Sequence, residues 1–571
     1  MKRIEYDVLF VGGGISSLSA AHRLVDLAKQ EKASLKIAVF EKGKDFGSHI
    51  LSGAVSNPRA VKKLFPDYET NGFPIEGICK ETCVMMLGCK KAWEIPPFIS
   101  PSEMNKLGYL ILSLSNVVKW MASSLTEKVK DSPSIIVDLY NGFPATEVIY
   151  NGSRIEGVKV DSTGNAENDN CYGKVTVFGD KGFLSRDIIT KFNLTQLPQK
   201  WAVGVKEIWE TQNDFSGKVW HTIGYPLLDG SFGGGFIYGL KDKRIAIGMI
   251  IGLDSENPAL HPPQILQNFK KHPWVQGMIK EGKVLKYGAA LVPEGGCYSL
   301  PREFSVDGGM LIGDALGILN LKGFSGIDKS MESGMTAADI IFEAVQKKDF
   351  SSGILRRFKQ RLMEGWVGKE LNDARYYRYA FHENKKVFGN YLPKIVKGLD
   401  ESGIVIGLLK AFISDPPGTI GSAINLRKMM SGKIDIGAVK WEEDRKYSKA
   451  DYKAKETAEP EGFNKNTIYS TADVVFYAST HYHIGNKHID EFSADVCKQC
   501  IQKYHSHGNE VPCVGDCTAE VHQIHIKDNE KVHFMNLENC VQCRTCEIVC
   551  PENNLKVNPA EHGSGPDFSG L

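Results

Sequence analysis

Eight cysteines lie near the C-terminal end of the sequence, in two groups of four. The second group has the spacing C-x2-C-x2-C-x3-C-P from Cys540 to Pro551, as in bacterial ferredoxins, where three thiolates bind one iron–sulfur cluster and the fourth binds its neighbour. The first group has the same pattern with a longer middle spacer, C-x2-C-x12-C-x3-C. If the crosswise rule holds, one 4Fe-4S cluster is bound by Cys517, Cys540, Cys543 and Cys546, and a second by Cys497, Cys500, Cys513 and Cys550.

Other uses of these thiols fit the spacing less well. Zinc also takes four thiolates, but structural zinc sites pair two C-x2-4-C units, or one such unit with two histidines. Disulfides belong to oxidising compartments, and no secretory signal opens the sequence. Eight cysteines already satisfy two clusters, so we expect the histidines nearby to be structural: His481, His483, His488, His505 and His507. The five cysteines elsewhere are expected to be buried packing residues: Cys79, Cys83, Cys89, Cys171 and Cys297.

A glycine turn near the N-terminus predicts a dinucleotide site. Residues 5–11 have the pattern of a buried strand, Gly12 to Gly14 follow at once, and residues 18–29 carry an apolar helical face. In such units the glycines let the backbone approach a pyrophosphate at the helix N-terminus. The third glycine of G-x-G-x-x-G is replaced by Ser17, which is small enough for close helix-to-strand packing. We therefore expect Gly12, Gly14 and Ser17 to serve cofactor binding.

Two later segments extend this site. Glu41 ends the next strand pattern, residues 36–40, where a carboxylate can accept hydrogen bonds from the ribose of FAD or NAD. Far downstream, an apolar strand pattern ends at Gly313 and Asp314. Gly317 comes next, and a helix is expected over residues 329–345. That pattern resembles the segment by which flavoproteins hold the ribityl chain, so it favours FAD, with these three residues in the site.

Composition bounds the possible partners. The 571 residues predict three to four domains. Lys plus Arg number 69 and Asp plus Glu 68, so no overall positive field attracts nucleic acid. No apolar run reaches the roughly 18 residues of a membrane-spanning helix. Residues 99–125 carry apolar side chains at helical spacing, which suits a core or a bilayer interface equally, and residues 404–413 form a second apolar stretch.

Beyond the cofactor motifs, the chain resembles the electron transfer flavoprotein-ubiquinone oxidoreductase family. Order and spacing are kept from residue 5 to the C-terminus, and the resembling segments include residues 47–55, 112–120, 204–209, 221–226, 233–238, 252–258 and 287–296. The resemblance implies electron transfer from a reduced electron transfer flavoprotein, through a 4Fe-4S cluster and FAD, to a membrane quinone (ubiquinone or menaquinone). It places the family's quinone-contacting glycines at Gly233 and Gly234, and its cluster ligands at Cys517, Cys540, Cys543 and Cys546. Without it, the glycine-rich apolar segment 230–252 would suit a plain sheet core.

The expected fold combines three parts. They are an α/β FAD-binding domain of the Rossmann-like, glutathione-reductase type, an inserted α+β quinone domain and a C-terminal α+β ferredoxin-like domain. The expected boundaries are residues 1–75, 125–200 and 300–350 for the FAD domain, 76–124 and 201–299 for the quinone domain, 351–440 for a helical region and 441–571 for the iron–sulfur domain. An electron relay needs no general base, so no catalytic side chain is nominated.

Two departures keep other functions open. Thr518 stands where the family usually has a proline after the cysteine, and the double set of cysteines looks like a ferredoxin-like partner fused to the flavoprotein. Such partners accompany electron-bifurcating complexes, so one alternative is a subunit of such a complex. Others are a geranylgeranyl reductase-like flavoprotein and a zinc-binding assembly module without flavin. With no transit peptide apparent, we expect a peripheral location on the cytoplasmic side of a bacterial-type inner membrane.

Overall fold

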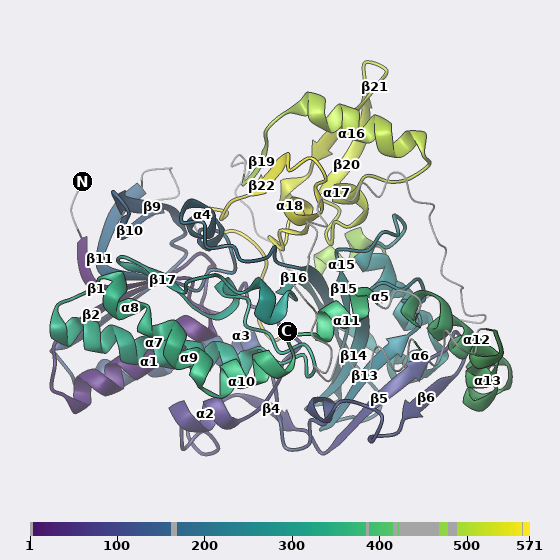
Figure 1. Ribbon diagram of the computed structural model, residues 1–571, viewed down its shortest axis with the longest axis horizontal. Helices are drawn as coiled ribbons and strands as arrows, with labels where there is room; N and C mark the ends of the chain where they lie inside the picture. The colour runs from purple at the N-terminus through teal and green to yellow at the C-terminus, as the bar shows by residue number, and fades with distance from the viewer. Residues whose placement is uncertain are drawn as a thin grey trace.

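Two large sheets lie side by side, and a smaller cysteine-rich domain sits over their junction (Figure 1). This computed structural model describes residues 4–161, 168–383, 387–414, 421, 468–477, 488–561 and 563–571. His481, His483 and the charged stretch 442–461 lie outside the described residues, as do the boundary between 440 and 441 and part of the expected helical region.

The first sheet has the parallel centre expected of a dinucleotide fold. Its strand order is β17-β18-β11-β1-β2-β8, with β10 and β9 added beside β11. Four neighbouring pairs are parallel: β18 with β11, β11 with β1, β1 with β2, and β2 with β8. The strands are β1 (Ile4–Val11), β2 (Leu35–Glu41), β8 (Ile135–Asn141), β9 (Ala145–Asn151), β10 (Arg154–Asp161), β11 (Asn168–Phe178), β17 (Ser305–Val306) and β18 (Gly309–Leu311).

Helix α1 (Ile15–Gln30) connects β1 to β2 and packs against α7 (Ile327–Lys347). Leu18, Ala21, Val25 and Ala28 recur every three or four residues along α1 and are fully buried, as an amphipathic helix over a sheet requires. The turn before α1 and the start of α7 therefore lie at the same edge of the first sheet, where ligands bind in such folds.

The apolar stripe predicted over residues 99–125 divides between a strand and a helix. Leu110 and Ile111 belong to β7 (Leu110–Leu112), which joins β3 (Val55–Ser56) and β4 (Ile75–Ile78) in a small sheet. Helix α3 (Leu114–Val129) follows and packs against α1 and β8, with Val117 and Met121 fully buried. This face covers the core of the first sheet. Residues 114–124 were expected in the quinone domain, but they pack with the first sheet.

The second sheet is antiparallel except where β13 pairs with β5. Its order is β16-β12-β15-β14-β13-β5-β6. Helices α5 (Pro262–Lys271) and α6 (Pro273–Ile279) follow β15, and α5 covers β12 and β15. The strands are β5 (Glu81–Leu87), β6 (Ala92–Ile95), β12 (Trp201–Glu210), β13 (Lys218–Gly224), β14 (Gly233–Leu240), β15 (Arg244–Gly252) and β16 (Lys283–Pro293).

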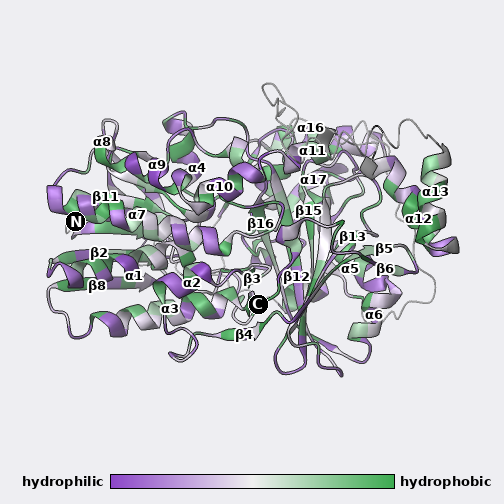
Figure 2. Cartoon of the chain, turned by 60° about the horizontal axis from the view of Figure 1, so that its bottom comes forward, coloured by the Kyte–Doolittle hydropathy of each residue, from purple (hydrophilic) through white to green (hydrophobic). Residues whose placement is uncertain are grey.

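Helices after α7 run from the first sheet to the far edge of the second. In Figure 2, α12 (Leu392–Ser402) and α13 (Ile404–Ser414) form that edge. Among the described residues, no helix combines the length and the hydropathy that crossing a bilayer requires. The helices between are α8 (Ser352–Leu355), α9 (Arg357–Glu364), α10 (Trp366–Asp373) and α11 (Tyr377–Glu383).

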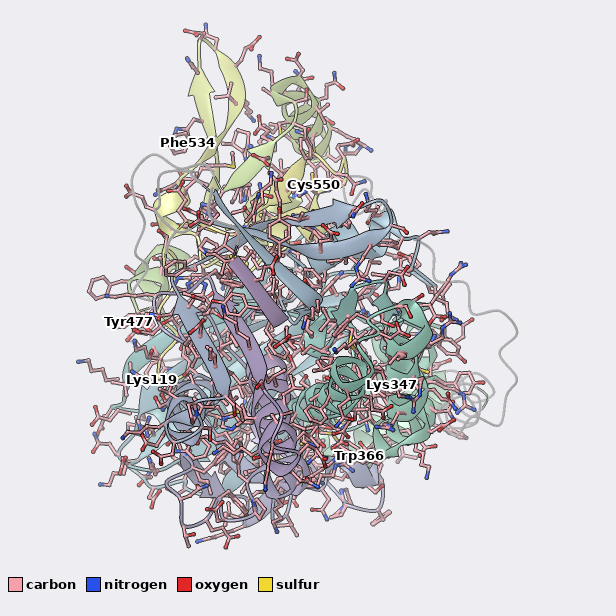
Figure 3. All side chains as sticks on the ribbon, turned by 90° about the vertical axis from the view of Figure 1, so that its left-hand side faces the viewer. Lys119, Lys347, Trp366, Tyr477, Phe534 and Cys550 are labelled. Carbon is pink, nitrogen blue, oxygen red and sulfur yellow. The ribbon has the colours of Figure 1, made fainter. Side chains whose placement is uncertain are left out.

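The cysteine-rich domain is built from two antiparallel strand pairs and several helices. Strand β19 (Ile489–Glu491) pairs with β22 (Leu555–Val557), and β20 (His522–Lys527) pairs with β21 (Glu530–Met535). The β20–β21 hairpin projects away from the molecule, whereas Cys550 lies nearer its body (Figure 3). The helices are α16 (Ala494–Ser506), α17 (Pro512–Gly515) and α18 (Thr545–Val549).

Candidate functional site

A cavity of about 650 Å³ lies between the two sheets and reaches the cysteine-rich domain. Its wall includes Gly12 and Gly14 of the glycine turn, Gly233 and Gly234 of β14, and Cys543 of the cysteine run. Three sets of residues that are far apart in sequence and were singled out for different chemistry therefore face one space.

The glycine turn has the form that a bound pyrophosphate requires. Gly12 has φ +90°, and a Cβ on it would lie 2.9 Å from the carbonyl oxygen of Gly179. At Gly14 the surroundings are open: the nearest atom to an added Cβ would be Ile50 Cδ1 at 3.9 Å. Gly14 is also the N-cap of α1, and no side chain caps that end. The first backbone N–H groups of α1 thus remain available to an anion.

Glu41 lies where the sequence predicted it, at the end of β2 on the cavity wall. Its carboxylate also shapes the turn, because Oε2 accepts from the Gly13 N–H at 2.9 Å and Oε1 from the Gly43 N–H at 2.7 Å. Asp180 lines the same region, and its Oδ1 is buried without a hydrogen-bond partner. Such an unpaired oxygen fits a ligand that brings its own donors.

Asp314 and the start of α7 complete this end of the cavity. Asp314 follows Gly313, which has φ +60° and donates its N–H to Ser333 Oγ at 3.0 Å. Helix α7 begins at Ile327, two residues earlier than predicted, and its N-cap Gly326 also lines the cavity without a side-chain cap. A second uncapped helix N-terminus therefore faces the ligand space.

Three predicted residues lie behind the cavity wall: Ser17, Gly317 and Gly313, the turn residue before Asp314. A Cβ at Gly179 would lie 2.7 Å from Ser17 Oγ, so Ser17 packs α1 against the end of β11. Gly317 has φ +77°, and a Cβ there would lie 2.4 Å from Gln199 Nε2. Ser17 and Gly317 thus shape the backbone. The open glycine turn, the unpaired Asp180 oxygen and the two helix ends fit FAD.

The other end of the cavity is apolar. Gly233, with φ +152°, and Gly234 begin β14, and Cβ atoms on them would lie 2.2 Å from the Ile250 carbonyl oxygen and 2.5 Å from the Thr222 carbonyl oxygen. Glycine is therefore required at both positions. Phe232, Phe236, Ile250 and Leu227 line the space around them, which suits a flat hydrophobic ligand.

The first predicted ligand set comes together at the junction of the domains. Burial raises the pKa of the Cys517 thiol to about 11, and the Cys543 thiol adds to the rise. Burial and then the thiols of Cys543, Cys540 and Cys517 raise the pKa of Cys546 well above its usual range. Backbone N–H groups point at two of the sulfurs, Val521 N–H at Cys517 Sγ and Gln542 N–H at Cys540 Sγ, both at 3.3 Å. Buried thiols that crowd each other ionise only beside a cation, and amide donors to sulfur are typical of iron–sulfur sites.

The second predicted set also comes together. Cys497, Cys500, Cys513 and Cys550 line one small cavity of about 20 Å³. Burial and then the thiols of Cys550, Cys500 and Cys497, followed by Cys517, raise the pKa of Cys513 well above its usual range. Asn554 donates its backbone N–H to Cys550 Sγ and its side-chain Nδ2–H to Cys497 Sγ, each at 3.2 Å. The two sets are those of the crosswise rule.

The cysteine run also contacts the flavin end of the cavity. Arg544 donates from Nη1 to the Lys181 carbonyl oxygen at 2.7 Å, and Lys181 Nζ lies 3.3 Å from Asp314 Oδ2. Lys42, next to Glu41, donates to Gln542 Oε1. Only a few side chains therefore separate the cysteine run from the residues around the flavin space.

Sequence reasoning missed several cavity residues. Lys42 follows the predicted Glu41, and Arg544 lies within the cysteine run, so these positions could have marked both as site residues. Asp180 carried no such signal, and Glu294 lay in the family-like segment 287–296, but nothing in either stretch marks a buried carboxylate with unpaired oxygens. Of the histidines expected to be structural, His488 is buried, His505 is half-buried and His507 is exposed.

Two of the other histidines could hold a metal with Cys513. Ligand atoms of Cys513, His522 and His533 lie within 4.8 Å of one another. His522 Nδ1 and His533 Nε2 are 2.9 Å apart and share a hydrogen bond. Among the described residues a second triplet, Glu491, Cys497 and His533, lies equally close, so His533 belongs to both arrangements that could hold an ion such as zinc.

Comparison with known proteins gives the same three parts. Residues 201–292 match the family described as "ETF-QO, ubiquinone-binding", residues 466–569 match "Electron transfer flavoprotein-ubiquinone oxidoreductase, 4Fe-4S", and residues 11–71 match "NAD(P)-binding Rossmann-like domain". In the solved structures, a geranylgeranyl bacteriochlorophyll reductase-like protein from Thermoplasma acidophilum shares the fold, with TM-score 0.56 and 18% identity over 74% of this chain and all of that one.

Full-length relatives extend over nearly the whole chain. The mitochondrial electron transfer flavoprotein-ubiquinone oxidoreductase of Dictyostelium discoideum is 30% identical, with 99% of this chain and 91% of that protein covered. The electron transfer flavoprotein-ubiquinone oxidoreductase of Pseudomonas aeruginosa is also 30% identical, with 100% of this chain and 99% of that protein covered. The chain therefore belongs to the electron transfer flavoprotein-ubiquinone oxidoreductase family.

Proposed function

We propose that this protein takes electrons from a reduced electron transfer flavoprotein and delivers them to a membrane quinone, ubiquinone or menaquinone. The observation that carries the proposal is the single cavity whose wall includes the glycine turn, the β14 glycines and the cysteine run. A dinucleotide space, an apolar ligand space and a cluster site that meet in one cavity suit transfer of electrons over short distances.

The FAD would be held by the residues at the edge of the first sheet. Gly12 and Gly14 would admit the pyrophosphate to the start of α1, Glu41 would face the ribose, and Asp314, placed by the Gly313 turn, would face the ribityl chain. Ser17 and Gly317 support this site by packing. When bound, FAD exchanges electrons singly or in pairs, which allows it to join a one-electron donor to a two-electron acceptor.

The first 4Fe-4S cluster would be held by Cys517, Cys540, Cys543 and Cys546. Its chemistry is one-electron transfer. Arg544 supports the proposal, because it ties this loop to Lys181 beside the flavin space at 2.7 Å. Thr518, in place of the family's usual proline, has its Oγ1 3.3 Å from Cys543 Sγ, and hydrogen bonds to the sulfurs are one of the terms that set a cluster's potential.

We also infer a second 4Fe-4S cluster on Cys497, Cys500, Cys513 and Cys550. In support, the four residues line one small cavity, and Asn554 directs two donors at their sulfurs. The competing occupant of this region is a zinc ion on Cys513, His522 and His533. A second cluster would give the protein the cofactors of a ferredoxin-like partner, which also favours, as a second candidate function, a subunit of an electron-bifurcating complex.

Gly233 and Gly234 would admit the quinone head group, and exposed apolar side chains on and beside the cavity wall support its arrival from a bilayer. Ile99 lines the cavity yet is 60% exposed, and its neighbour Phe98 is 88% exposed. Leu392 and Ile395 of α12 also line it, and α13 beside them exposes Val405, Leu408, Leu409 and Phe412. Exposed apolar groups around a lipid-substrate entrance suit peripheral docking on a bilayer. We place that contact on the cytoplasmic side of the inner membrane.

The first test combines metal analysis with turnover. On anaerobically purified protein, the proposal predicts one FAD and two 4Fe-4S clusters per chain, and quinone reduction that depends on reduced electron transfer flavoprotein. A Cys497→Ser variant should lose the iron of one cluster, whereas the matched Cys171→Ser variant, in β11, should lose none. Zinc in place of the second cluster's iron would refute the second cluster alone. Absence of quinone reduction by the fully loaded protein would refute the main proposal and favour the bifurcating complex.

A further inference from the structure

Glu294 is a buried acid on the wall of the shared cavity. It follows the last residue of β16, its side chain has no solvent exposure, and both carboxylate oxygens are buried without a hydrogen-bond partner. An ionised carboxylate in this position would lack the hydrogen bonds that burial normally demands. The group therefore keeps a proton, meets a ligand, or does both in turn.

Burial favours the protonated form of Glu294, and the nearby cation of Arg378 only partly opposes it. Arg378 on α11 has its Nε 3.7 Å from Glu294 Oε2, which is too long for a hydrogen bond. The same guanidinium donates from Nη2 to both carboxylate oxygens of Asp254 at 2.5 Å, so Asp254 and Glu294 share its charge. Burial, partly offset by Arg378 and reinforced by Asp254, raises the pKa of Glu294 to about 8.

This acid lies at the quinone end of the cavity. Pro293, the residue before it, pairs with Trp201, whose indole Nε1 also lines the region without a hydrogen-bond partner. The Arg378 guanidinium lies 4.2 Å from the centre of the Phe232 ring, and Phe232 immediately precedes Gly233. An unpaired acid and an unpaired N–H thus face the space beside the β14 glycines, as a ligand with carbonyl oxygens would require.

We propose that Glu294 is the acid that protonates the quinone during its reduction, an inference that rests on the function proposed above. Reduction of a quinone to a quinol consumes two electrons, which the loaded protein supplies, and two protons. In the proposed step the Glu294 O–H bond breaks, a quinone O–H bond forms, and the carboxylate left behind is stabilised by Arg378. Solvent water supplies the second proton and returns the first to Glu294.

The test compares two electron acceptors on the loaded protein. A soluble quinone analogue needs protons when it is reduced, whereas ferricyanide accepts single electrons and needs none. After reduction with dithionite, reoxidation by each acceptor is followed by stopped-flow absorbance of the flavin. Glu294→Gln should slow reoxidation by the quinone about 100-fold or more, as expected for loss of a general acid. Reoxidation by ferricyanide should be unchanged, and Glu294→Asp should recover part of the quinone rate.

The exposed Glu303 offers a matched control, and Glu303→Gln should leave both rates unchanged. Two further measurements probe the proton itself. In the unaltered protein, the quinone rate divided by the ferricyanide rate should fall above pH 8, close to the pKa of Glu294. Infrared difference spectra between pH 7 and pH 9 should show a carboxylic-acid band that Glu294→Gln lacks.

The possible outcomes separate the two proposals. If the unaltered protein reduces quinone and Glu294→Gln does so equally fast, Glu294 is not the proton donor. Equal slowing with both acceptors would assign it to flavin binding or folding, and a flat ratio of rates across pH 8 in the unaltered protein would by itself overturn the inference. If the unaltered protein reduces ferricyanide but no quinone, the proposed function itself is wrong, and the inference falls with it.

Discussion

Replacing Gly14 with alanine should separate cofactor binding from folding. In the structure Gly14 has φ −76° and ψ 178°, a conformation that alanine adopts readily. The added Cβ would meet nothing closer than Ile50 Cδ1 at 3.9 Å. The expected cost to the apoprotein is therefore that of alanine in place of glycine at an N-cap, below about 1 kcal/mol.

The same methyl group would project into the space where we place the pyrophosphate. If it displaces the phosphate oxygens from two backbone N–H groups, each charge-assisted hydrogen bond lost is worth about 1.5–3 kcal/mol. The sum, about 3–6 kcal/mol, corresponds to a loss of FAD affinity of roughly 100-fold to 10,000-fold. Gly277, an exposed residue of α6 with no atom within 4 Å of an added Cβ, provides the control, and Gly277→Ala should leave FAD affinity unchanged.

The assay is FAD titration of the apoprotein by fluorescence, with urea denaturation of the same samples. Gly14→Ala should combine near-normal unfolding with weak FAD binding. Normal FAD affinity in this variant would refute the placement of the pyrophosphate at the start of α1. A loss of several kcal/mol in the apoprotein would instead show that Gly14 is required for folding.

Three further changes test the core and the surface. Burial, with a smaller contribution from Lys128, lowers the pKa of His22 from 6.5 to about 3, so the folded state opposes its protonation. The free energy of unfolding should therefore fall as the pH drops below 6.5, by about 2 kcal/mol at pH 5. In urea denaturation, His22→Gln should remove that part of the dependence of stability on pH. Glu207 is fully buried and accepts a hydrogen bond from Lys270 at 2.9 Å. Lys270→Met would remove this cation and should lower the free energy of unfolding by about 3–5 kcal/mol. An unchanged midpoint of urea denaturation would contradict this expectation. Leu408→Asp, at a side chain 51% exposed on α13, should weaken sedimentation with anionic lipid vesicles without changing FAD content, and unchanged binding would exclude α13 from the membrane contact.

The local features of the chain could be predicted from its sequence. The spacing of the cysteines, the Gly12–Gly14 turn between strand and helix, and the carboxylate of Glu41 each depend on a few consecutive residues. Their backbone conformation follows from glycine's freedom at positive φ and from strand and helix periodicity. The structure accordingly has α1 and α7 within three residues of their expected ends, at Ile15–Gln30 and Ile327–Lys347.

Tertiary packing decided the rest. Helical spacing over residues 99–125 could not show that Leu110 and Ile111 would pair as a strand, or that α3 would pack on the first sheet, because burial on either side of a domain boundary produces the same pattern. Nor could sequence place Glu294 beside Arg378, which lies 84 residues later and approaches to 3.7 Å. Such contacts depend on how two sheets and a third domain close around one cavity, and no short stretch of sequence contains that information.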